Sequence, residues 1–361
     1  MNISTPYVKV DLDKVENNIK RMVKGLSDAG VAHRPHIKPH KCIEIAKKQI
    51  ALGAKGITTA KISEAEVMVK GGITDVLIAF PILGENALQR LKKLCQKADV
   101  KTTVDSMTLA EGISKIGEEL NTKIKVLIEI DGGLHRGGLQ PGQATLDFAK
   151  EISVLPGIEL VGIFGYMGQI YGEGNRENIK VAAKREADML IETKKLLNDN
   201  GINVEITSAG STPSSTFPEQ LTGITESRAG NYVYYDMNAV VLGIAKEEDC
   251  ALKVRSRVVS TPLPGYASID AGSKTLTTDG SLAGANYGYI CGKPGVEIVK
   301  LNEEHGFLRF DPEKYDLKVG DEVEVIPNHS CVISNLSEVV YGFRNGKFEK
   351  ELTVDARGKN Y

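Results

Sequence analysis

A ten-residue segment, His33 to Cys42, concentrates side chains that can do acid–base and nucleophilic chemistry. It reads His-Arg-Pro-His-Ile-Lys-Pro-His-Lys-Cys and holds three of the six histidines in the chain. Val31 and Ile37 indicate a strand that leads into it, and Pro39 ends that strand because proline lacks a ladder donor. Lys38 then stands at the carboxyl end of a strand, where α/β proteins place reactive groups. A lysine among basic groups can act as an amine nucleophile, although a basic surface loop would read the same way.

Two further segments carry residues suited to an anionic ligand. The first, Asp131-Gly-Gly-Leu-His-Arg-Gly-Gly138, surrounds Arg136 with glycines that allow close approach of the backbone, and a guanidinium suits a phenolate or carboxylate. The second, Thr207-Ser-Ala-Gly-Ser-Thr-Pro-Ser214, offers small hydroxyls and backbone N–H groups ahead of Pro213, a favoured first helical residue. The alternatives are a flexible loop with an incidental arginine and a plain polar loop.

A third segment, Ile326-Pro-Asn-His-Ser-Cys-Val332, offers two metal ligands. We expect a strand here, on which His329 and Cys331 would share one face. Two ligands are too few for a closed structural zinc site but suit a catalytic site completed by water or substrate. The alternative is a buried histidine beside a buried cysteine.

The elements that must position these residues alternate regularly from Tyr7 to about Ala245. A first helix is expected after Asp11, which can cap it, and the apolar runs then predict eight strand–helix units. That is the size of a TIM barrel, and the missing Gly-x-Gly-x-x-Gly turn disfavours a doubly wound sheet. The expected strands end at Lys38 or span 55–60, 75–80, 100–104, 124–130, 158–165, 204–208 and 224–230.

The pattern changes after about Ala245 to short apolar runs separated by Gly, Pro, Asp and Asn, which predicts an all-β domain. We therefore expect a (β/α)8 barrel over residues 11–245 and a β domain over 246–361 that recruits residues 1–10. The expected β-domain strands are 254–260, 265–270, 296–301, 307–310 and 321–326.

Composition limits the partners. A net charge of -2 and a pI near 6.4 argue against nucleic acid or an anionic membrane. No apolar run reaches a membrane span of ~18 residues, and the first residues lack a signal-peptide pattern. Five cysteines without a spacing framework fit a reduced cytoplasmic protein.

The segment Arg34-Pro-His-Ile-Lys-Pro-His-Lys41 resembles the cofactor-lysine segment of the D-threonine aldolase and D-serine dehydratase family. That family belongs to the fold type III pyridoxal-phosphate enzymes, which include alanine racemase. The resemblance implies that Lys38 carries the cofactor and that Arg136, in an Asp-x-Gly-x-x-Arg-x-Gly segment, reaches its phenolic side. Tyr166 or Tyr171 would flank the pyridine ring or donate a proton. Gln169 stands where the family often has histidine, which puts an acid–base role there in doubt.

The remaining site residues also follow from the resemblance. The Gly-Ser-Thr-Pro segment implies a phosphate cup, and the Pro-Asn-His-x-Cys segment implies that His329 and Cys331 hold a divalent metal, Mn, Mg or Zn. The phosphate cup would comprise Ser208, Gly210, Ser211, Thr212, Gly230, Asn231 and Tyr232.

The implied activity is retro-aldol cleavage of small-molecule D-β-hydroxy amino acids to glycine and an aldehyde, as in D-threonine aldolase, with His40 or a metal-bound water as the base. If Lys38 instead removes the Cα proton, the same residues make a D-serine dehydratase, and D-3-hydroxyaspartate cleavage is a third variant. From another class, a non-catalytic pyridoxal-phosphate carrier lacks the β domain, and a racemase would need a tyrosine motif that we do not find. By resemblance we also expect a homodimer.

Overall fold

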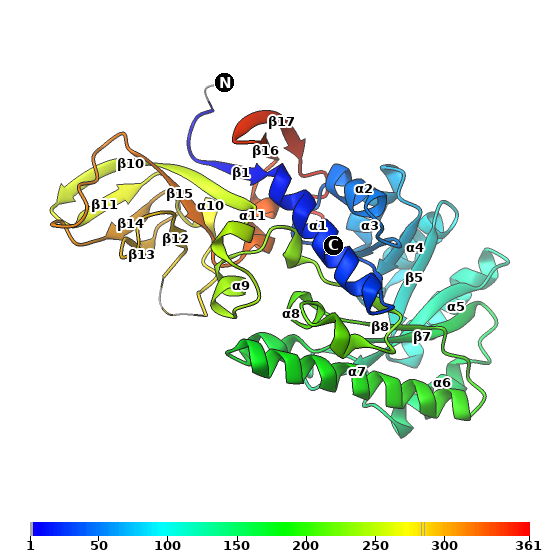
Figure 1. The fold of residues 1–361 in the computed structure, drawn as a ribbon. Coiled ribbons are helices and arrows are strands. Elements are labelled where there is room, and N and C mark those ends of the chain that lie inside the picture. Colours follow the sequence, from blue (N-terminus) through cyan, green and yellow to red (C-terminus); the bar gives the residue numbers. More distant parts are fainter. Residues whose placement is uncertain (1–2, 283, 285) are drawn as a thin grey trace. The chain divides into compact units, whose positions relative to one another are not determined.

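The computed structural model describes residues 3–282, 284 and 286–361 (Figure 1). The chain forms two compact units. The barrel unit comprises Lys20–Lys38, Ile45–Gly230 and Lys359–Tyr361, and the β unit comprises Met1–Ile19, Pro39–Glu44 and Asn231–Gly358. The chain passes from the barrel unit to the β unit after Lys38 and after Gly230. Both residues belong to segments in which site residues are predicted.

The barrel unit is built on a parallel sheet of eight strands in the described residues, in the order β2-β9-β8-β7-β6-β5-β4-β3. The edge strands β2 and β3 are joined as well, because the Ile37 amide donates to the Thr58 carbonyl oxygen and the Thr58 amide donates to that of Pro35. The sheet therefore closes on itself. Its strands are β2 (Ala32–His33), β3 (Ile57–Thr59), β4 (Asp75–Ile78), β5 (Asp99–Val104), β6 (Ile124–Asp131), β7 (Ile158–Tyr166), β8 (Ile206–Ala209) and β9 (Glu226–Ser227).

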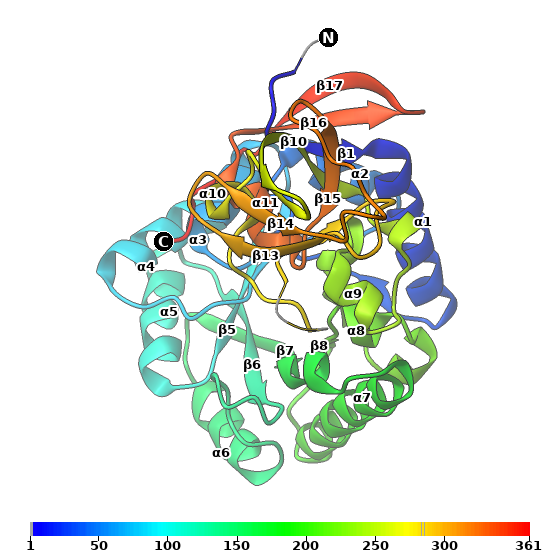
Figure 2. The same ribbon diagram turned by 90° about the vertical axis from the view of Figure 1, so that its left-hand side faces the viewer.

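Helices connect these strands, and Figure 2 shows α4 to α7 around the outside of β5 to β8. The first helix begins where expected, because Asp11 Oδ1 accepts from the amides of Asp13 and Lys14. Asn175 caps α7 by accepting from the Asn178 amide. The helices are α1 (Leu12–Asp28), α2 (Ile43–Ala51), α3 (Ile62–Lys70), α4 (Glu85–Cys95), α5 (Met107–Glu119), α6 (Gln143–Ile152), α7 (Arg176–Asp199) and α8 (Thr212–Ser215), with 3-10 turns η1 (Gly168–Gly172) and η2 (Pro218–Leu221).

The β unit holds a sheet of nine strands in the described residues, in the order β11-β14-β13-β12-β15-β10-β1-β16-β17. The long strand β10 pairs with both β15 and β11, so six of these strands form a closed ring. The strands are β1 (Tyr7–Asp11), β10 (Leu252–Leu263), β11 (Tyr266–Ile269), β12 (Tyr289–Ile290), β13 (Glu297–Leu301), β14 (Gly306–Arg309), β15 (Glu322–Ile326), β16 (Val339–Arg344) and β17 (Lys347–Thr353).

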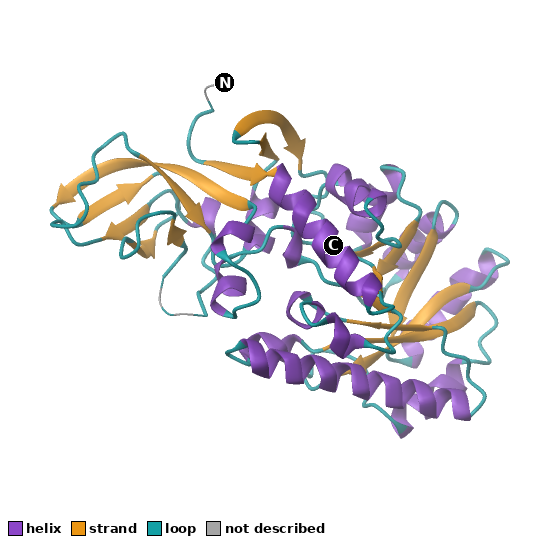
Figure 3. Cartoon of the chain, viewed as in Figure 1, coloured by secondary structure: helices purple, strands orange, loops and turns teal. Residues whose placement is uncertain are grey.

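Short helices complete the β unit, as the colouring of Figure 3 makes plain. They are α9 (Met237–Val241), α10 (Ser273–Leu276) and α11 (Ser330–Leu336), with 3-10 turns η3 (Asn231–Val233) and η4 (Glu247–Asp249).

The predicted fold class, an α/β barrel followed by a β domain, is confirmed. Seven barrel strands lie where the apolar runs place them, and the five expected β-domain strands correspond to β10, β11, β13, β14 and β15. The strand expected to end at Lys38 is shorter: β2 ends at His33, since Pro35 has no N–H for the ladder, and Lys38 lies in a turn. The N-terminal strand β1 pairs antiparallel with β10 and parallel with β16. Among the described residues, no helix combines the length and apolar character that a membrane span requires.

Candidate active site

Three predicted site residues come together at the carboxyl ends of the barrel strands. Tyr166 is the last residue of β7 and pairs with Asp131 at the end of β6. The Nζ atom of Lys38, an exposed residue in the turn after β2, lies 5.9 Å from the centre of the Tyr166 ring. The guanidinium carbon of Arg136 lies 4.8 Å from the same centre. A primary amine and a permanent cation therefore gather at one aromatic ring.

The loop that carries Arg136 is fastened by Asp131. Its carboxylate accepts from the amides of Gly133 and His135, and its Oδ2 lies 2.6 Å from Nδ1 of His135. Burial alone would raise the pKa of Asp131, but the hydrogen bonds from His135 and Gly133 outweigh it and lower that pKa to about 2. Gln169 adds a further tie, since its Nε2 donates to the Gly132 carbonyl at 2.6 Å. The loop is thus held at its start, just before Arg136.

The turn after β8, where the phosphate cup is predicted, is tightly built. Gly210 adopts a φ of +88°, and a Cβ there would meet Ser227 Oγ at 2.1 Å, so only glycine suits the position. Its amide donates to Glu186 Oε1, and the Ser211 amide donates to Ser214 Oγ. These two N–H groups are therefore engaged within the chain. The role of Ser208, Gly210, Ser211 and Thr212 in binding phosphate stays a prediction.

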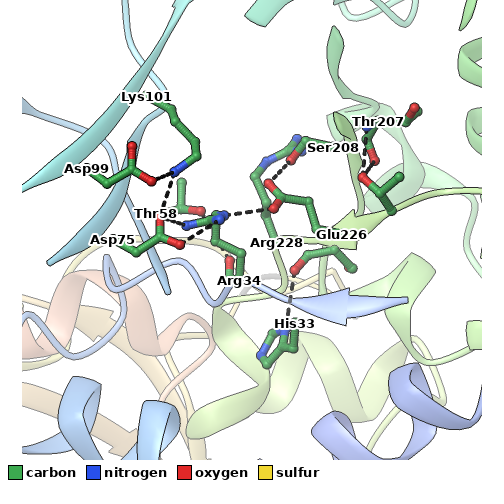
Figure 4. Close-up of polar contacts among 12 residues, drawn as sticks. His33, Arg34, Thr58, Asp75, Asp99, Lys101, Thr207, Ser208, Glu226 and Arg228 are labelled. Atoms are coloured by element: carbon green, nitrogen blue, oxygen red, sulfur yellow. Dashed lines mark hydrogen bonds and ion pairs between the residues drawn. The ribbon is translucent and has the colours of Figure 1, made fainter. Parts of the chain in front are cut away.

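Buried charges link the strands beneath this turn, as Figure 4 shows. The Arg34 guanidinium is fully buried and donates from Nε to Glu226 Oε2 at 2.9 Å and from Nη1 to Asp75 Oδ1 at 2.6 Å. Lys101 also reaches Asp75, at 2.9 Å. Arg34, the first residue of the family-like segment, thus holds strands together instead of contributing a free charge beside Lys38.

The same chain of contacts continues to Arg228. Ser208 Oγ donates to Glu226 Oε1 at 2.8 Å and accepts from Arg228 Nη1 at 2.7 Å. Arg228 also donates to the Gly165 carbonyl and stacks 3.7 Å from the centre of the Phe164 ring. Burial lowers the pKa of Arg228 to about 10. Sequence reasoning assigned no role to Arg228 or Glu226, because nothing in the sequence pairs residues so far apart.

The predicted metal ligands lie in the β unit. The strand expected there is wrong: His329 immediately precedes helix α11, and Cys331 lies in its first turn. The two side chains still interact, because the charge of Cys331, followed by its hydrogen bond and by Asp236 and Asp279, raises the pKa of His329 to about 10 although burial opposes this. His329 Nδ1 lies 2.7 Å from Asp279 Oδ2.

Asn231 contacts the segment that carries His329 and Cys331. Asn231 Nδ2 donates to Asp236 Oδ2 at 2.6 Å and lies 3.8 Å from Cys331 Sγ. Tyr232 is fully buried in the β unit, whereas Gly230 ends the barrel unit. A phosphate role for Gly230, Asn231 and Tyr232 stays a prediction.

The two remaining basic residues of the family-like segment differ from Lys38. His40 is fully buried, and its Nδ1 accepts from the Cys42 amide. Lys41 is buried with a φ of +50°, and its Nζ donates to Asn335 Oδ1 at 2.9 Å. The exposed amine of this segment is therefore that of Lys38, the residue that the resemblance implies as the cofactor lysine.

These residues fit the groups that the resemblance implies. An exposed amine and a guanidinium at one ring, beside a turn that only glycine can make, suit an aromatic aldehyde with anionic oxygens such as pyridoxal phosphate. An imidazole whose Nδ1 faces a carboxylate, next to a thiol, suits a borderline-soft divalent metal. Within the described residues, no group of three or more His, Cys, Asp and Glu side chains could hold a metal, so protein ligands alone would leave coordination positions open.

Comparison with known proteins identifies the family of the chain. The alanine racemase N-terminal domain family matches residues 10–238, and the putative serine dehydratase domain family matches residues 251–343. The chain belongs to the D-threonine aldolase and D-serine dehydratase family. It is therefore a lyase of the fold type III group, whose alanine racemase-like barrel implies pyridoxal phosphate.

Relatives within the family have different named activities. D-threo-3-hydroxyaspartate dehydratase of Delftia sp. strain HT23 is 32% identical over 92% of each chain, and D-threonine aldolase of Arthrobacter sp. is 31% identical over 99% of this chain and 93% of that one. The crystal structure of D-threonine aldolase from Filomicrobium marinum has a TM-score of 0.92 at 29% identity and covers 99% of this chain and 97% of its own. The family thus fixes the cofactor class and the lyase class but not the substrate.

Proposed function

We propose that this protein is a metal-dependent D-threonine aldolase that cleaves D-β-hydroxy amino acids to glycine and an aldehyde. The observation that carries the proposal is the likeness of nearly the whole chain to a solved D-threonine aldolase. The exposed amine of Lys38 and the His329–Cys331 pair supply the chemical groups that this reaction needs.

The surroundings of each residue support the role that we propose for it. Lys38 holds the cofactor through its amine, and Arg136 and Tyr166 orient the cofactor ring. The side chains of Lys38 and Arg136 both lie at the Tyr166 ring, which supports these roles. When bound, pyridoxal phosphate supplies a sink for the electrons released at Cα. His329 and Cys331 would hold the divalent ion, which would supply Lewis-acid polarisation of the substrate's β-hydroxyl.

Proton transfer decides which bond breaks. If His40 takes the proton of the β-hydroxyl, the Cα–Cβ bond breaks, and D-threonine gives glycine and acetaldehyde. If Lys38 instead takes the Cα proton, the β-hydroxyl leaves and D-serine gives pyruvate and ammonia. We assign the first course to this protein.

A second candidate is D-threo-3-hydroxyaspartate dehydratase. It is favoured by the 32% identity to the Delftia enzyme and by its solved structure, which has a TM-score of 0.90. Two further structures are of mutants of that enzyme. One mutant has a histidine replaced by alanine, and the other, in the metal-free form, has a cysteine replaced by alanine two positions further along the chain. The same spacing separates His329 and Cys331, which supports the proposed metal ligands.

The test is a product analysis. Purified protein with pyridoxal phosphate and Mn²⁺ is incubated separately with D-threonine, D-serine and D-threo-3-hydroxyaspartate, with L-threonine as the control. Glycine and acetaldehyde in equal amounts from D-threonine, with little pyruvate from D-serine, are expected. Oxaloacetate and ammonia from the hydroxyaspartate as the dominant products would replace the aldolase with the dehydratase.

Two variants test the residue roles. Lys38→Ala should lose the visible absorbance of covalently held cofactor, and a retained band would move the attachment to Lys41. His329→Ala should abolish turnover with the cofactor still bound, and full activity would refute the metal site. Size-exclusion chromatography with light scattering checks the proposed homodimer.

A further inference from the structure

We propose that Asp279 is a positioning residue that holds the imidazole of His329 for a divalent metal ion. This inference rests on the metal site of the proposed function and adds a residue that neither the sequence nor the family comparison assigned. All the residues involved belong to the β unit.

The geometry at His329 fixes which ring nitrogen is available. Nδ1 of His329 lies 2.7 Å from Asp279 Oδ2, and a carboxylate at that distance accepts the Nδ1 proton. A metal ion would then bind at Nε2 and displace the proton that this nitrogen carries in the charged ring, while Nδ1 keeps its own proton. Metal-bound histidines almost always donate their other ring N–H to such an acceptor, which orients the ring and raises its basicity.

Asp279 is itself anchored to the segment that it supports. Asn328, the buried neighbour of His329, donates from Nδ2 to the carbonyl oxygens of Asp279 and Asn286, at 3.2 and 2.8 Å. The Asp279 amide donates to Thr277 Oγ1 at 3.1 Å. The carboxylate is thus held at a set position relative to the ring instead of meeting it by chance.

The second predicted ligand is supported in a similar way. The buried carboxylate of Asp236 accepts from the Ser330 amide at 2.9 Å and from Asn231 Nδ2 at 2.6 Å. Ser330 lies between His329 and Cys331, and Asn231 Nδ2 reaches toward Cys331 Sγ. Each candidate ligand therefore has its own carboxylate partner, one acting on the His329 side chain and one on the backbone beside Cys331.

A purely structural role explains the Asp279–His329 contact less well. Both side chains are partly open to solvent, with exposed fractions of 40% and 41%, and ion pairs that are this exposed contribute little to stability. Since stability gains little from the contact, orientation of the ring is the better explanation. The same exposure means that Asp279 variants should fold.

The experiment measures metal binding by the cofactor-loaded, metal-stripped enzyme with Co²⁺ as the probe. A thiolate–Co²⁺ absorbance that is lost in Cys331→Ala reports occupancy, and a hyperfine-shifted, exchangeable proton signal reports the Nδ1–H of His329. Asp279→Ala should bind Co²⁺ about 10–100-fold more weakly and lose the exchangeable signal. Asp279→Asn, whose amide oxygen still accepts a proton, should fall between that variant and the unmodified enzyme.

The matched control is Asp316→Asn, since Asp316 is also in the β unit but is 81% exposed and pairs with Lys318 across 3.3 Å. It should bind like the unmodified enzyme, and circular dichroism should show all variants folded. Equal affinity and a retained exchangeable signal in Asp279→Ala would overturn the role of Asp279 alone. No thiolate–Co²⁺ absorbance in the unmodified enzyme would overturn the metal site as well, so the two failures are distinguishable.

Discussion

Replacing Arg34 with methionine should destabilise the barrel unit strongly. The guanidinium has no exposed surface, and it neutralises Glu226, which is equally buried, and Asp75, whose side chain is 27% exposed. Asp75 keeps Lys101 and some water when Arg34 is lost, whereas Glu226, which is fully buried, loses the guanidinium that donates to it directly and keeps the hydroxyl of Ser208 and the nearby charge of Arg228. Removing one partner of a buried ion pair costs about 3–5 kcal/mol, and we expect a loss in that range.

A double-mutant cycle isolates the cause. Glu226→Gln retains an acceptor for Ser208 without the negative charge, so Arg34→Met with Glu226→Gln should recover roughly 2–3 kcal/mol relative to the sum of the single variants. The free energy of unfolding is measured from equilibrium urea curves followed by circular dichroism. A loss below about 1 kcal/mol for Arg34→Met, or additive single variants, would refute the reasoning that an unpaired Glu226 charge is the main cost.

Three further predictions concern the barrel unit. Burial lowers the pKa of His33 to about 4, so between about pH 6.5 and 4 the unfolded chain binds a proton that the folded chain does not. The free energy of unfolding should therefore fall by up to about 1.4 kcal/mol for each unit by which the pH is lowered in this range. In His33→Gln, the urea midpoint should depend less on pH. The lowered pKa of Asp131 gives a stabilisation that is present above about pH 4 and lost as pH falls through about 2. Asp131→Asn should speed hydrogen exchange at the amides of Gly133 and His135, which donate to this carboxylate. Unchanged exchange would contradict the role of Asp131 in fastening the loop. Gly210→Ala should weaken pyridoxal phosphate binding in a fluorescence titration, and it should lower stability by more than the ~1–2 kcal/mol that a positive φ costs an alanine. The control is Gly142→Ala, because Gly142 has the same φ of +88° but an added Cβ would meet nothing within 4 Å. This variant should leave cofactor affinity unchanged.

Local sequence patterns predicted the barrel well, because each buried strand is a short apolar run between turn residues. The run from Ile124 to Ile130 became β6, and Asp11 caps the first helix as expected. Long-range pairing was not predictable in the same way. Glu226 lies 192 residues from Arg34 and Asp75 lies 41 from it, and only the closed sheet brings the three charges together.

The β unit shows where local reasoning failed. Val332 and Ile333 favour a strand by residue type, yet Ser330–Leu336 is helical, because tertiary context overrides so weak a preference. The hairpin of β16 and β17 was missed although Asn345 and Gly346, both with positive φ, form the strongest short hairpin signal.

The candidate site was predicted in part. Lys38, Arg136 and Tyr166 lie together because all three stand at or after the carboxyl ends of barrel strands, a property of the barrel itself. Asp236 could have been suspected as a helix cap, since it precedes α9 and accepts from the Ala239 amide. No sequence signal marks Asp279, because its importance lies in the distance between its carboxylate and one ring nitrogen.

The position of β1 in the middle of its sheet has a consequence for synthesis of the chain. Tyr7 pairs with Arg255 and Lys9 with Tyr341, so β1 emerges from the ribosome about 250 residues before its first partner. At translation rates of about 5–20 residues per second, the strand waits roughly 12 to 50 s with both edges unpaired. Lys9 places a charge in the centre of this five-residue strand, and such charges discourage pairing with other chains during the wait.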